Sequence, residues 1–190
     1  MRRRLRLGID LDGVVADFNR GWTDLHNAEF GGSISPAVVD RWDCLPEVGG
    51  FADMREFWAW ASPKKHRASI FRHLPVYEGA LEVLERLASD HHVVVVTAKP
   101  RWAVHDTFAW LSDVGFPTTE VHVIDDKHLV DCDVYVDDSP HVLAALLRHR
   151  SDRAILRYVR PWNEPAPGLT SVSDWGDIEA TVRTVSDSAR

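Results

Sequence analysis

The chain has 190 residues, of which 45% are hydrophobic and 27% are charged. This composition is typical of a globular protein with one good core and room for a small subdomain. The formal net charge of −7 argues against a protein that binds nucleic-acid polymers, which is usually basic, and no apolar stretch is long enough to cross a bilayer. The two cysteines, Cys44 and Cys132, form no disulfide framework, so we expect a reducing, cytoplasmic location.

A short apolar run near the start of the chain leads into two carboxylates, in the stretch LGIDLDGVVADF at residues 7–18. Asp10, Asp12 and Gly13 follow the run, which predicts a buried strand that ends in a tight turn. Two ionised acids this close repel each other unless a cation lies between them or one keeps its proton. Oxygen ligands of this kind suit Mg²⁺. A plain surface turn is the alternative, because D-x-D-G is also common loop chemistry.

Residues 18–74 contain short helical patterns that are interrupted by proline and glycine. Helices are predicted at residues 18–30, 36–42, 54–61 and 63–71. A crossover between parallel strands needs only a dozen or so residues, so this segment is predicted to be a small helical domain inserted after the first strand. Residues 1–17 and 75–190 are predicted to form the main α/β domain.

From residue 75 onward, strand and helix patterns alternate. Strands are predicted at residues 93–96, 121–124, 134–136 and 154–159, and helices at 78–89, 101–113, 140–149 and 178–185. The continuous β-branched run at 93–96 is typical of a strand that is covered on both faces. The alternation predicts an α/β fold with a doubly wound parallel sheet.

The first four predicted strands each end in polar side chains: Asp10 and Asp12, then Thr97, then Lys127, then Asp137 and Asp138. The carboxyl ends of parallel strands lie along one edge of a sheet, so these residues are expected to converge. Taken singly, each has a structural explanation, such as a helix cap at Thr97 or a solvated loop at Lys127. Together they form a complete set for phosphoryl transfer through a carboxylate nucleophile.

The chain resembles phosphatases of the haloacid-dehalogenase superfamily, and within it the 5′(3′)-deoxyribonucleotidase group. The matching segments are DLDGVVADF at 10–18, VYEGALEVLERL at 76–87, VVVVTAK at 93–99 and DDKHLVDCDVYVDDSP at 125–140. The inserted helices correspond to the family's small helical cap. Ala98 is a departure, because related nucleotidases often carry a second hydroxyl there; its absence removes one side-chain donor to the phosphate.

The resemblance implies a Mg²⁺-dependent phosphomonoester hydrolase that acts on (deoxy)ribonucleoside monophosphates through an aspartyl-phosphate. It assigns nucleophilic attack to Asp10 and proton transfer to Asp12. The implied metal ligands are the Asp10 side chain, the Asp12 backbone carbonyl and Asp138, and the implied phosphate-binding residues are Thr97 and Lys127. Asp137 is expected to support the site, although the sequence leaves open whether Asp137 or Asp138 is the direct ligand.

The inserted helices are expected to close over the site and to select the leaving group. Phe18 and Trp42 are the candidates for contact with a nucleobase, since bases stack on aromatic rings. Packing of the insertion's own core is the alternative explanation for these rings.

Other functions remain open from the sequence. A phosphatase for another small ester, such as a sugar phosphate or a biosynthetic intermediate, is the alternative within the same superfamily. A signalling receiver domain also uses strand-end acids, a hydroxyl and a lysine, but the long insertion and the spacing of Asp12 argue against it. Asp12 also argues against a dehalogenase, which has no alkoxide to protonate. A homodimer is one arrangement that the sequence does not exclude.

Overall fold

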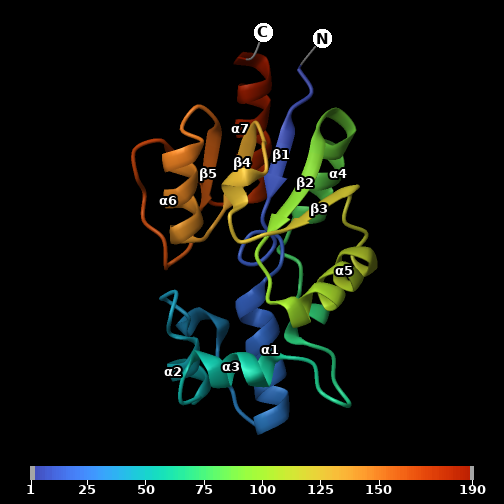
Figure 1. The fold of residues 1–190 in the computed structure, drawn as a ribbon, viewed down its shortest axis with the longest axis vertical. Helices are drawn as coiled ribbons and strands as arrows, with labels where there is room; N and C mark the ends of the chain where they lie inside the picture. The colour runs from blue at the N-terminus through green and yellow to red at the C-terminus, as the bar shows by residue number, and fades with distance from the viewer. Residues whose placement is uncertain (1–2, 189–190) are drawn as a thin grey trace. The chain divides into compact units, whose positions relative to one another are not determined.

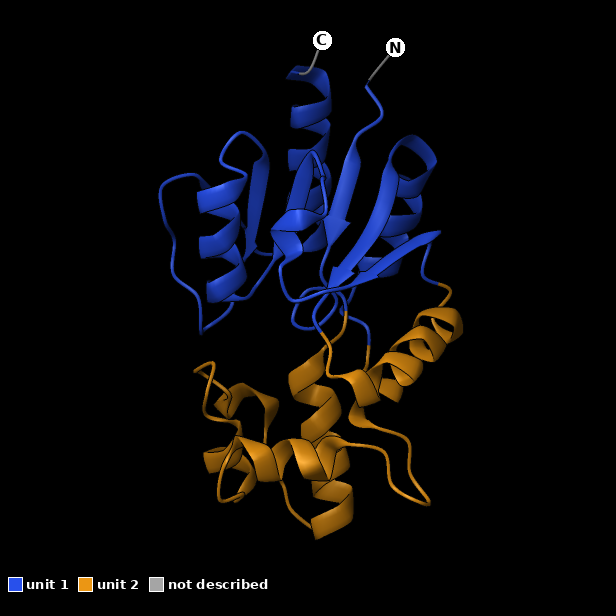
Figure 2. Ribbon diagram, viewed as in Figure 1, with its two compact units in different colours: residues 1–15, 76–98, 116–190 blue, residues 16–75, 99–115 orange. Residues whose placement is uncertain are grey.

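The computed structural model describes residues 3–188. The chain divides into two compact units (Figure 2): residues 1–15, 76–98 and 116–190 form what we call the α/β unit, and residues 16–75 and 99–115 form the helical unit. Within the described residues no helix is both long enough and apolar enough to span a membrane.

The α/β unit is built on a six-stranded sheet whose neighbouring strands all run parallel, in the order β3-β2-β1-β4-β5-β6. Figure 1 labels β1 to β5. The strands are β1 (Arg6–Ile9), β2 (His92–Thr97), β3 (Glu120–Val123), β4 (Val134–Asp137), β5 (Ala154–Tyr158) and β6 (Leu169–Val172). The order changes direction at β1, which has β2 on one side and β4 on the other. The predicted doubly wound parallel sheet is therefore confirmed, and β6 is an additional strand that the sequence pattern did not indicate.

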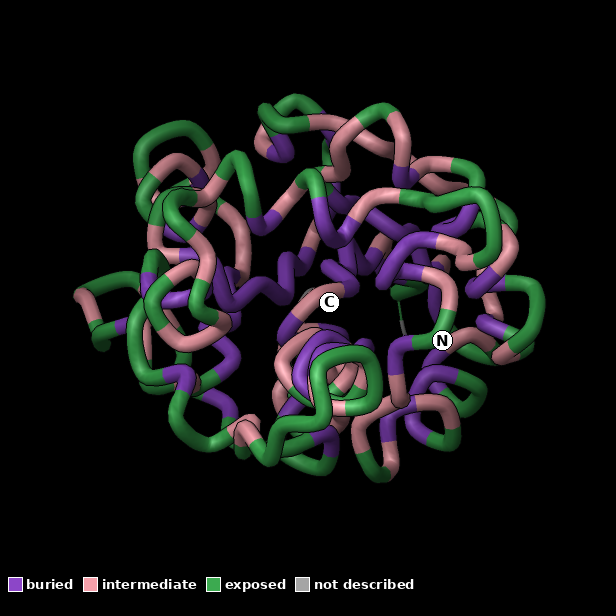
Figure 3. The backbone as a smooth tube through the Cα atoms, turned by 90° about the horizontal axis from the view of Figure 1, so that it is seen from below, coloured by how far each residue is buried: buried purple, intermediate pink, exposed green. Residues whose placement is uncertain are grey.

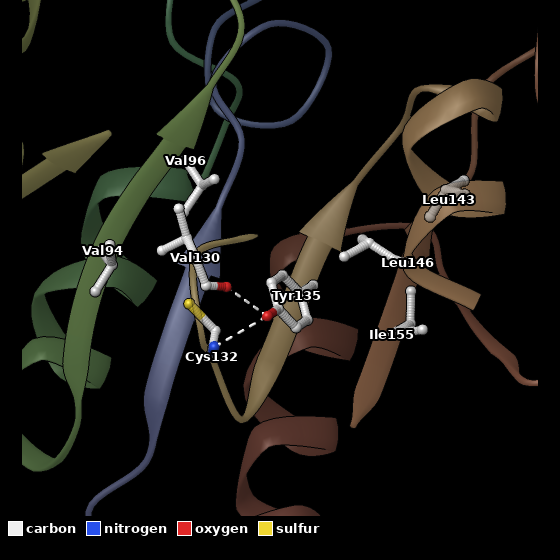
Figure 4. Close-up of a cluster of buried hydrophobic side chains, with 8 residues drawn as sticks. All are labelled: Val94, Val96, Val130, Cys132, Tyr135, Leu143, Leu146 and Ile155. Carbon is white, nitrogen blue, oxygen red and sulfur yellow. Dashed lines mark hydrogen bonds between the residues drawn. The ribbon is translucent and has the colours of Figure 1, made fainter. Parts of the chain in front are cut away.

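Three long helices cover the sheet: α4 (Ala80–Asp90), α6 (Pro140–His149) and α7 (Trp175–Ser188). Helices α4 and α7 pack against each other, whereas α6 packs on β5. Apolar residues from α6 and the neighbouring strands form a buried cluster (Figure 4), with Val94, Tyr135, Leu146 and Ile155 among its members. Because side chains alternate along a strand, the intervening residues of β2 and β4 are buried on the opposite face.

Burial follows this layering. All four residues of β4 and five of the six residues of β2 are buried, while the edge strand β3 is half-buried throughout. Figure 3 shows the buried backbone in the interior and the exposed segments at the periphery. The strands that carry the site residues are therefore the buried ones, apart from β3 at the edge.

The helical unit contains α1 (Phe18–Phe30), α2 (Leu45–Gly49), α3 (Met54–Ala61), α5 (Val104–Asp113) and the short 3-10 helices Pro36–Val38, Ile70–Arg72 and Arg101–Ala103. Asp17 caps the start of α1 by accepting a hydrogen bond from the Arg20 amide at 3.1 Å. Gly31 ends the helix in the left-handed conformation.

Aromatic side chains form the core of the helical unit. Trp22 and Phe57 meet edge to face, with ring centroids 5.6 Å apart, and Phe57 also lies 5.8 Å from Trp60. A second group places Trp58 and Phe71 nearly parallel at 6.2 Å, with Phe18 lying 5.8 Å from Phe71. Aromatic burial on this scale contributes much of the stability of so small a unit.

The helix predicted at residues 63–71 is wrong. Lys64 and Arg67 instead form an isolated antiparallel bridge, and only Ile70–Arg72 makes a single 3-10 turn. In a helix the Ser69 amide would donate to a backbone carbonyl one turn earlier. It donates instead to the Asp106 carboxylate, at 2.7 Å. This distant contact competes with local helix formation, which hydrophobic spacing alone does not reveal.

Residues 99–115, which the predicted boundaries assign to the α/β domain, group with the helical unit by their contacts. The Trp110 indole N–H donates to the Leu74 carbonyl at 2.8 Å, and Arg72 pairs with Asp113. Together with the bond between Ser69 and Asp106, these contacts tie α5 to residues 69–74.

Candidate active site

The site begins where β1 ends. The Asp10 amide donates to the Val136 carbonyl at 3.0 Å, which extends the pairing of β1 and β4 by one residue and fixes the Asp10 backbone. A tight turn follows, closed by bonds from the Val14 and Val15 amides to the Leu11 carbonyl at 3.2 and 2.8 Å. Gly13 has φ +74°, and a Cβ there would lie 2.0 Å from Asp138 Oδ2, so glycine is required for both conformation and space.

Lys127 links two of the acids. It lies in the 3-10 helix Lys127–Leu129 after β3, and its ammonium is 2.8 Å from Asp10 Oδ1 and 2.7 Å from Asp137 Oδ2. The lysine is only 4% exposed. Burial lowers the pKa of this ammonium, but the charges of Asp10 and Asp137 outweigh burial and raise the pKa above its usual value. Lys127 therefore stays charged.

Asp137 and Asp138 follow β4 and are both buried, but they have different partners. Asp137 Oδ2 accepts from Lys127, and its Oδ1 accepts from the Ser139 amide at 2.9 Å, so both oxygens are engaged. Burial raises the pKa of Asp137 to about 6 against the lowering effect of Lys127. Burial, together with the negative charges of Asp10 and Asp137, raises the pKa of Asp138 well above its usual range. Ser139 and Pro140 then start α6.

The three acids meet closely enough to share a metal ion. Asp10, Asp137 and Asp138 each offer a carboxylate oxygen within 4.8 Å of the others, and all three residues are buried. Their excess negative charge is costly in a buried site unless a cation compensates it. Hard oxygen donors of this kind fit a divalent cation.

Thr97 ends β2, the neighbour of β1 in the sheet. The register pairs Ile9 with Val95, so Thr97 lies at the same edge as Asp10. The residue is 1% exposed, and its hydroxyl has no hydrogen-bond partner among the residues that the structure describes. A buried hydroxyl without a partner is costly, and its position at this edge fits a ligand oxygen.

The structure thus brings Asp10, Lys127, Asp137 and Asp138 into direct contact or within metal-sharing distance. Asp12 lies on the adjoining turn of the same unit. The two aromatic candidates belong to the helical unit: Phe18 packs among Trp58 and Phe71, and Trp42 is 48% exposed. Their roles stay predictions.

Three polar residues after β5 were not predicted from the sequence. The Trp162 indole N–H donates to Asp138 Oδ2 at 3.1 Å, Asn163 donates to the Asp138 carbonyl at 2.7 Å, and Arg160 donates to the Gly13 carbonyl at 2.7 Å. The sequence could have indicated these residues, because they follow β5, which ends at the same edge as the first four strands.

Known proteins resemble the whole chain. Residues 3–187 match the profile of the 5′ nucleotidase, deoxy (Pyrimidine), cytosolic type C protein family. A 5′(3′)-deoxyribonucleotidase from Clostridium acetobutylicum is 25% identical over 89% of this chain and 97% of its own length. The human mitochondrial 5′(3′)-deoxyribonucleotidase is 24% identical over 75% of this chain and 66% of its own length. YfnB from Bacillus subtilis, a structure with bound magnesium, superposes with a TM-score of 0.64 at 11% identity, over 95% of this chain and 99% of that one.

The parallel sheet with its strand-end acids and buried lysine has the fold of haloacid-dehalogenase-like hydrolases. Because the family profile spans nearly all of its length, the chain belongs to the 5′ nucleotidase, deoxy (Pyrimidine), cytosolic type C protein family, and it is a phosphatase of the nucleotidase type.

Proposed function

We propose that this enzyme is a Mg²⁺-dependent 5′-nucleotidase that hydrolyses (deoxy)ribonucleoside monophosphates through an aspartyl-phosphate at Asp10. The observation that carries the proposal is the buried ammonium of Lys127 between Asp10 and Asp137, beside the second acid Asp138. The ion pair with Lys127 holds the Asp10 carboxylate in a fixed direction, as a nucleophile requires. The names of the relatives support the choice of substrate class.

In the first step, an Asp10 carboxylate oxygen attacks phosphorus, and the bond between phosphorus and the ester oxygen breaks. Asp12 gives its proton to the leaving alkoxide, which departs as the nucleoside. The unpartnered hydroxyl of Thr97 donates to a phosphoryl oxygen. Lys127 offsets the charge that develops on another oxygen.

In the second step, water attacks the phosphorus of the aspartyl-phosphate. Asp12, now ionised, accepts the proton of that water, and the bond between phosphorus and the Asp10 oxygen breaks. Inorganic phosphate leaves, and both carboxyl groups return to their starting states. Asp12 thus serves as acid and then as base, so its removal slows both steps.

The metal would be held by the Asp10 side chain, the Asp12 backbone carbonyl and Asp138. Asp138 is preferred to Asp137 because both oxygens of Asp137 already accept hydrogen bonds. When bound, Mg²⁺ reduces repulsion between the carboxylate and the phosphoryl group and stabilises charge in the transition state. Asp137 then orients Lys127.

The helical unit is proposed to be the cap that selects the nucleoside, with Phe18 and Trp42 in contact with the base. An increase in KM for nucleoside monophosphates, without an increase for p-nitrophenyl phosphate, in Phe18→Ala or Trp42→Ala tests this assignment. The free cysteines, Cys44 and Cys132, fit the reducing environment of the cytoplasm, where we propose that the enzyme works.

A phosphate-release screen tests the function. The purified protein is assayed against deoxyribonucleoside and ribonucleoside 5′-monophosphates, 3′-monophosphates and sugar phosphates, with Mg²⁺ and with excess chelator. We expect nucleoside monophosphates to give the highest kcat/KM and the chelator to abolish turnover. A preference for sugar phosphates would instead support the alternative substrate class.

The Asp10→Asn variant tests the nucleophile in the same screen. Its turnover should fall by at least about 10³-fold, because the amide cannot form the covalent intermediate. Asp90→Asn, at an exposed position at the end of α4, is the matched control and should keep full activity. Retained turnover in Asp10→Asn would refute the nucleophile assignment.

A further inference from the structure

The segment between β5 and β6 is anchored to the α/β unit by buried polar contacts. Arg157 Nη1 donates to Asn163 Oδ1 at 2.7 Å and to the Asn163 carbonyl at 3.0 Å. Its Nη2 donates to Ser171 Oγ on β6 at 2.8 Å. Arg157 and Asn163 are themselves buried. Asn163 is therefore held by a buried arginine of β5 that is itself bonded to β6.

This segment contacts Asp138 through two donors. Asn163 Nδ2 bridges the carbonyls of Asp138 and Tyr158 at 2.7 and 2.9 Å, which fixes the Asp138 backbone. The Trp162 indole N–H donates to Asp138 Oδ2 at 3.1 Å. The same Oδ2 lies against Gly13, where a Cβ would collide with it. Two sides of this oxygen are thus occupied.

The segment also holds the turn after β1. Arg160 Nε donates to the Gly13 carbonyl at 2.7 Å. The Arg160 guanidinium lies 4.2 and 4.3 Å from the ring centroids of Tyr77 and Tyr158, so it is stacked as well as bonded. Gly13 follows Asp12, whose backbone carbonyl is a proposed metal ligand.

We propose that residues 157–163 form a positioning segment that holds Asp138 so that only its Oδ1 faces the cation, and that this selects Mg²⁺ over Ca²⁺. The inference rests on the proposed metal role of Asp138 and assigns Trp162 and Asn163 as positioning residues. In this assignment both residues act through Asp138 and are not themselves ligands of the metal or the substrate.

The chemistry of the two ions supports this selection. Mg²⁺ requires near-octahedral geometry and short bonds, which a carboxylate held to one-oxygen coordination satisfies. Ca²⁺ accepts more ligands and often binds both oxygens of a carboxylate. The indole N–H at Oδ2 and the close approach of Gly13 hold the Asp138 carboxylate in one orientation, which disfavours coordination through both oxygens. Loss of that donor frees the carboxylate to rotate.

Trp162→Phe removes the indole N–H and keeps an aromatic ring. The matched control is Trp175→Phe at the start of α7, because Trp175 is buried in the same unit and its indole N–H has no partner among the described residues. Calorimetric titration with MgCl₂ and with CaCl₂ measures the dissociation constants without substrate. Steady-state kinetics at saturating Mg²⁺ then separates kcat from KM.

In Trp162→Phe we expect Mg²⁺ binding to weaken by about 10- to 100-fold, as for other groups that orient metal ligands. Ca²⁺ binding should weaken less or strengthen. The dissociation constant for Mg²⁺ divided by that for Ca²⁺ should therefore increase. At saturating Mg²⁺ the KM for the nucleotide should stay unchanged. Trp175→Phe should bind both ions like the wild type.

If Trp162→Phe binds Mg²⁺ and Ca²⁺ with the same dissociation constants as Trp175→Phe, the inference is overturned, while the proposed function stays intact. A wild-type protein that releases phosphate but binds no Mg²⁺ would instead refute the metal dependence, and with it this role of Trp162. Circular dichroism checks that each variant is folded. If Trp162→Phe does not fold, Trp162→Met provides the same comparison, because methionine is apolar and also lacks a donor for Asp138 Oδ2.

Discussion

Two buried carboxylates, one in each unit, differ in a way that separates chemistry from structure. In the helical unit, burial raises the pKa of Asp106, but hydrogen bonds from Ser69 and His105 outweigh burial and lower the pKa below its usual value. In the α/β unit, burial and two neighbouring acids raise the pKa of Asp138 well above its usual range. Hydrogen bonds from neighbouring residues stabilise the ionised form of Asp106. The surroundings of Asp138 instead disfavour its ionised form.

The same contrast extends to the rest of each unit. The helical unit buries large rings such as Trp22, Phe57 and Phe71, which stabilise it by excluding water. The α/β unit gathers buried charges at one edge of its sheet, at a cost that is tolerated at a functional site. Replacing an acid at that edge should therefore lower catalysis without a loss of stability, whereas replacing Asp106 should lower stability without a loss of catalysis.

Among the substitutions that test this contrast, Asp138→Asn is expected to lower turnover strongly. Turnover should fall by at least about 10²-fold, because a proposed metal ligand loses its charge. The raised pKa means that ionised Asp138 destabilises the metal-free fold at pH values above the unfolded-state pKa. Asp138→Asn should therefore increase the free energy of unfolding at pH 7 without metal, measured by urea denaturation. An Asp138→Asn protein with wild-type turnover and a lower free energy of unfolding would contradict the comparison.

Lys127→Met should destabilise the metal-free protein by roughly 3–5 kcal/mol, because removal of one partner leaves buried charges uncompensated. Excess Mg²⁺ should restore part of this loss, since it supplies positive charge to the same acids. Urea denaturation with and without Mg²⁺ measures both effects. Lys65→Met, at an exposed position of the helical unit, is the control and should show neither.

Asp106→Asn sharpens the comparison from the other side. The amide keeps the shape but weakens the bond that the Ser69 amide donates, so we expect a loss of about 1–3 kcal/mol in unfolding free energy. Mg²⁺ affinity and kcat with p-nitrophenyl phosphate should stay at wild-type values. Weakened Mg²⁺ binding in Asp106→Asn would show that the two carboxylates are not separate in function.

The smallest effect is expected at Glu120, which starts β3, at the opposite end of the strand from the active-site edge. Hydrogen bonds from Arg6 and then His122 lower the pKa of Glu120 to about 2. Because the folded-state pKa is depressed, its contribution is complete above pH 4.5 and is lost as the pH falls toward 2. The group is partly exposed, so Glu120→Gln should cost about 1 kcal/mol at pH 7. Thermal unfolding between pH 2 and 7 should show the difference from wild type disappear in acid.

The sequence predicted which residues meet at one edge of the sheet, because the parallel topology alone brings them there. Parallel strands put Asp10, Thr97, Lys127 and Asp138 at one edge whatever the details of packing. The short apolar runs that end at these residues were therefore sufficient to find them. The sequence could not decide between Asp137 and Asp138 as the metal ligand. That choice depends on hydrogen bonds such as the one from the Ser139 amide to Asp137, which follow from backbone geometry.

Features that depend on distant contacts were missed. The four residues of β6 follow a loop rich in proline, and their pairing with β5 gives no periodic signal in so short a run. The contact of Trp162 with Asp138 requires the path of the loop after β5. The helix predicted at residues 63–71 fails because Asp106, far along the chain, accepts from the Ser69 amide.

The central claim is that Asp10 becomes phosphorylated. The most direct measurement is mass spectrometry of the wild type and of Asp12→Asn, quenched in acid during turnover of p-nitrophenyl phosphate with Mg²⁺. Asp12→Asn should accumulate the intermediate, because a phenolic leaving group needs little protonation while hydrolysis still needs the base. We predict a phosphoryl group on the peptide that contains Asp10, removed by hydroxylamine. A phosphoryl group on another residue, or steady turnover with none on Asp10 in either protein, would contradict the account.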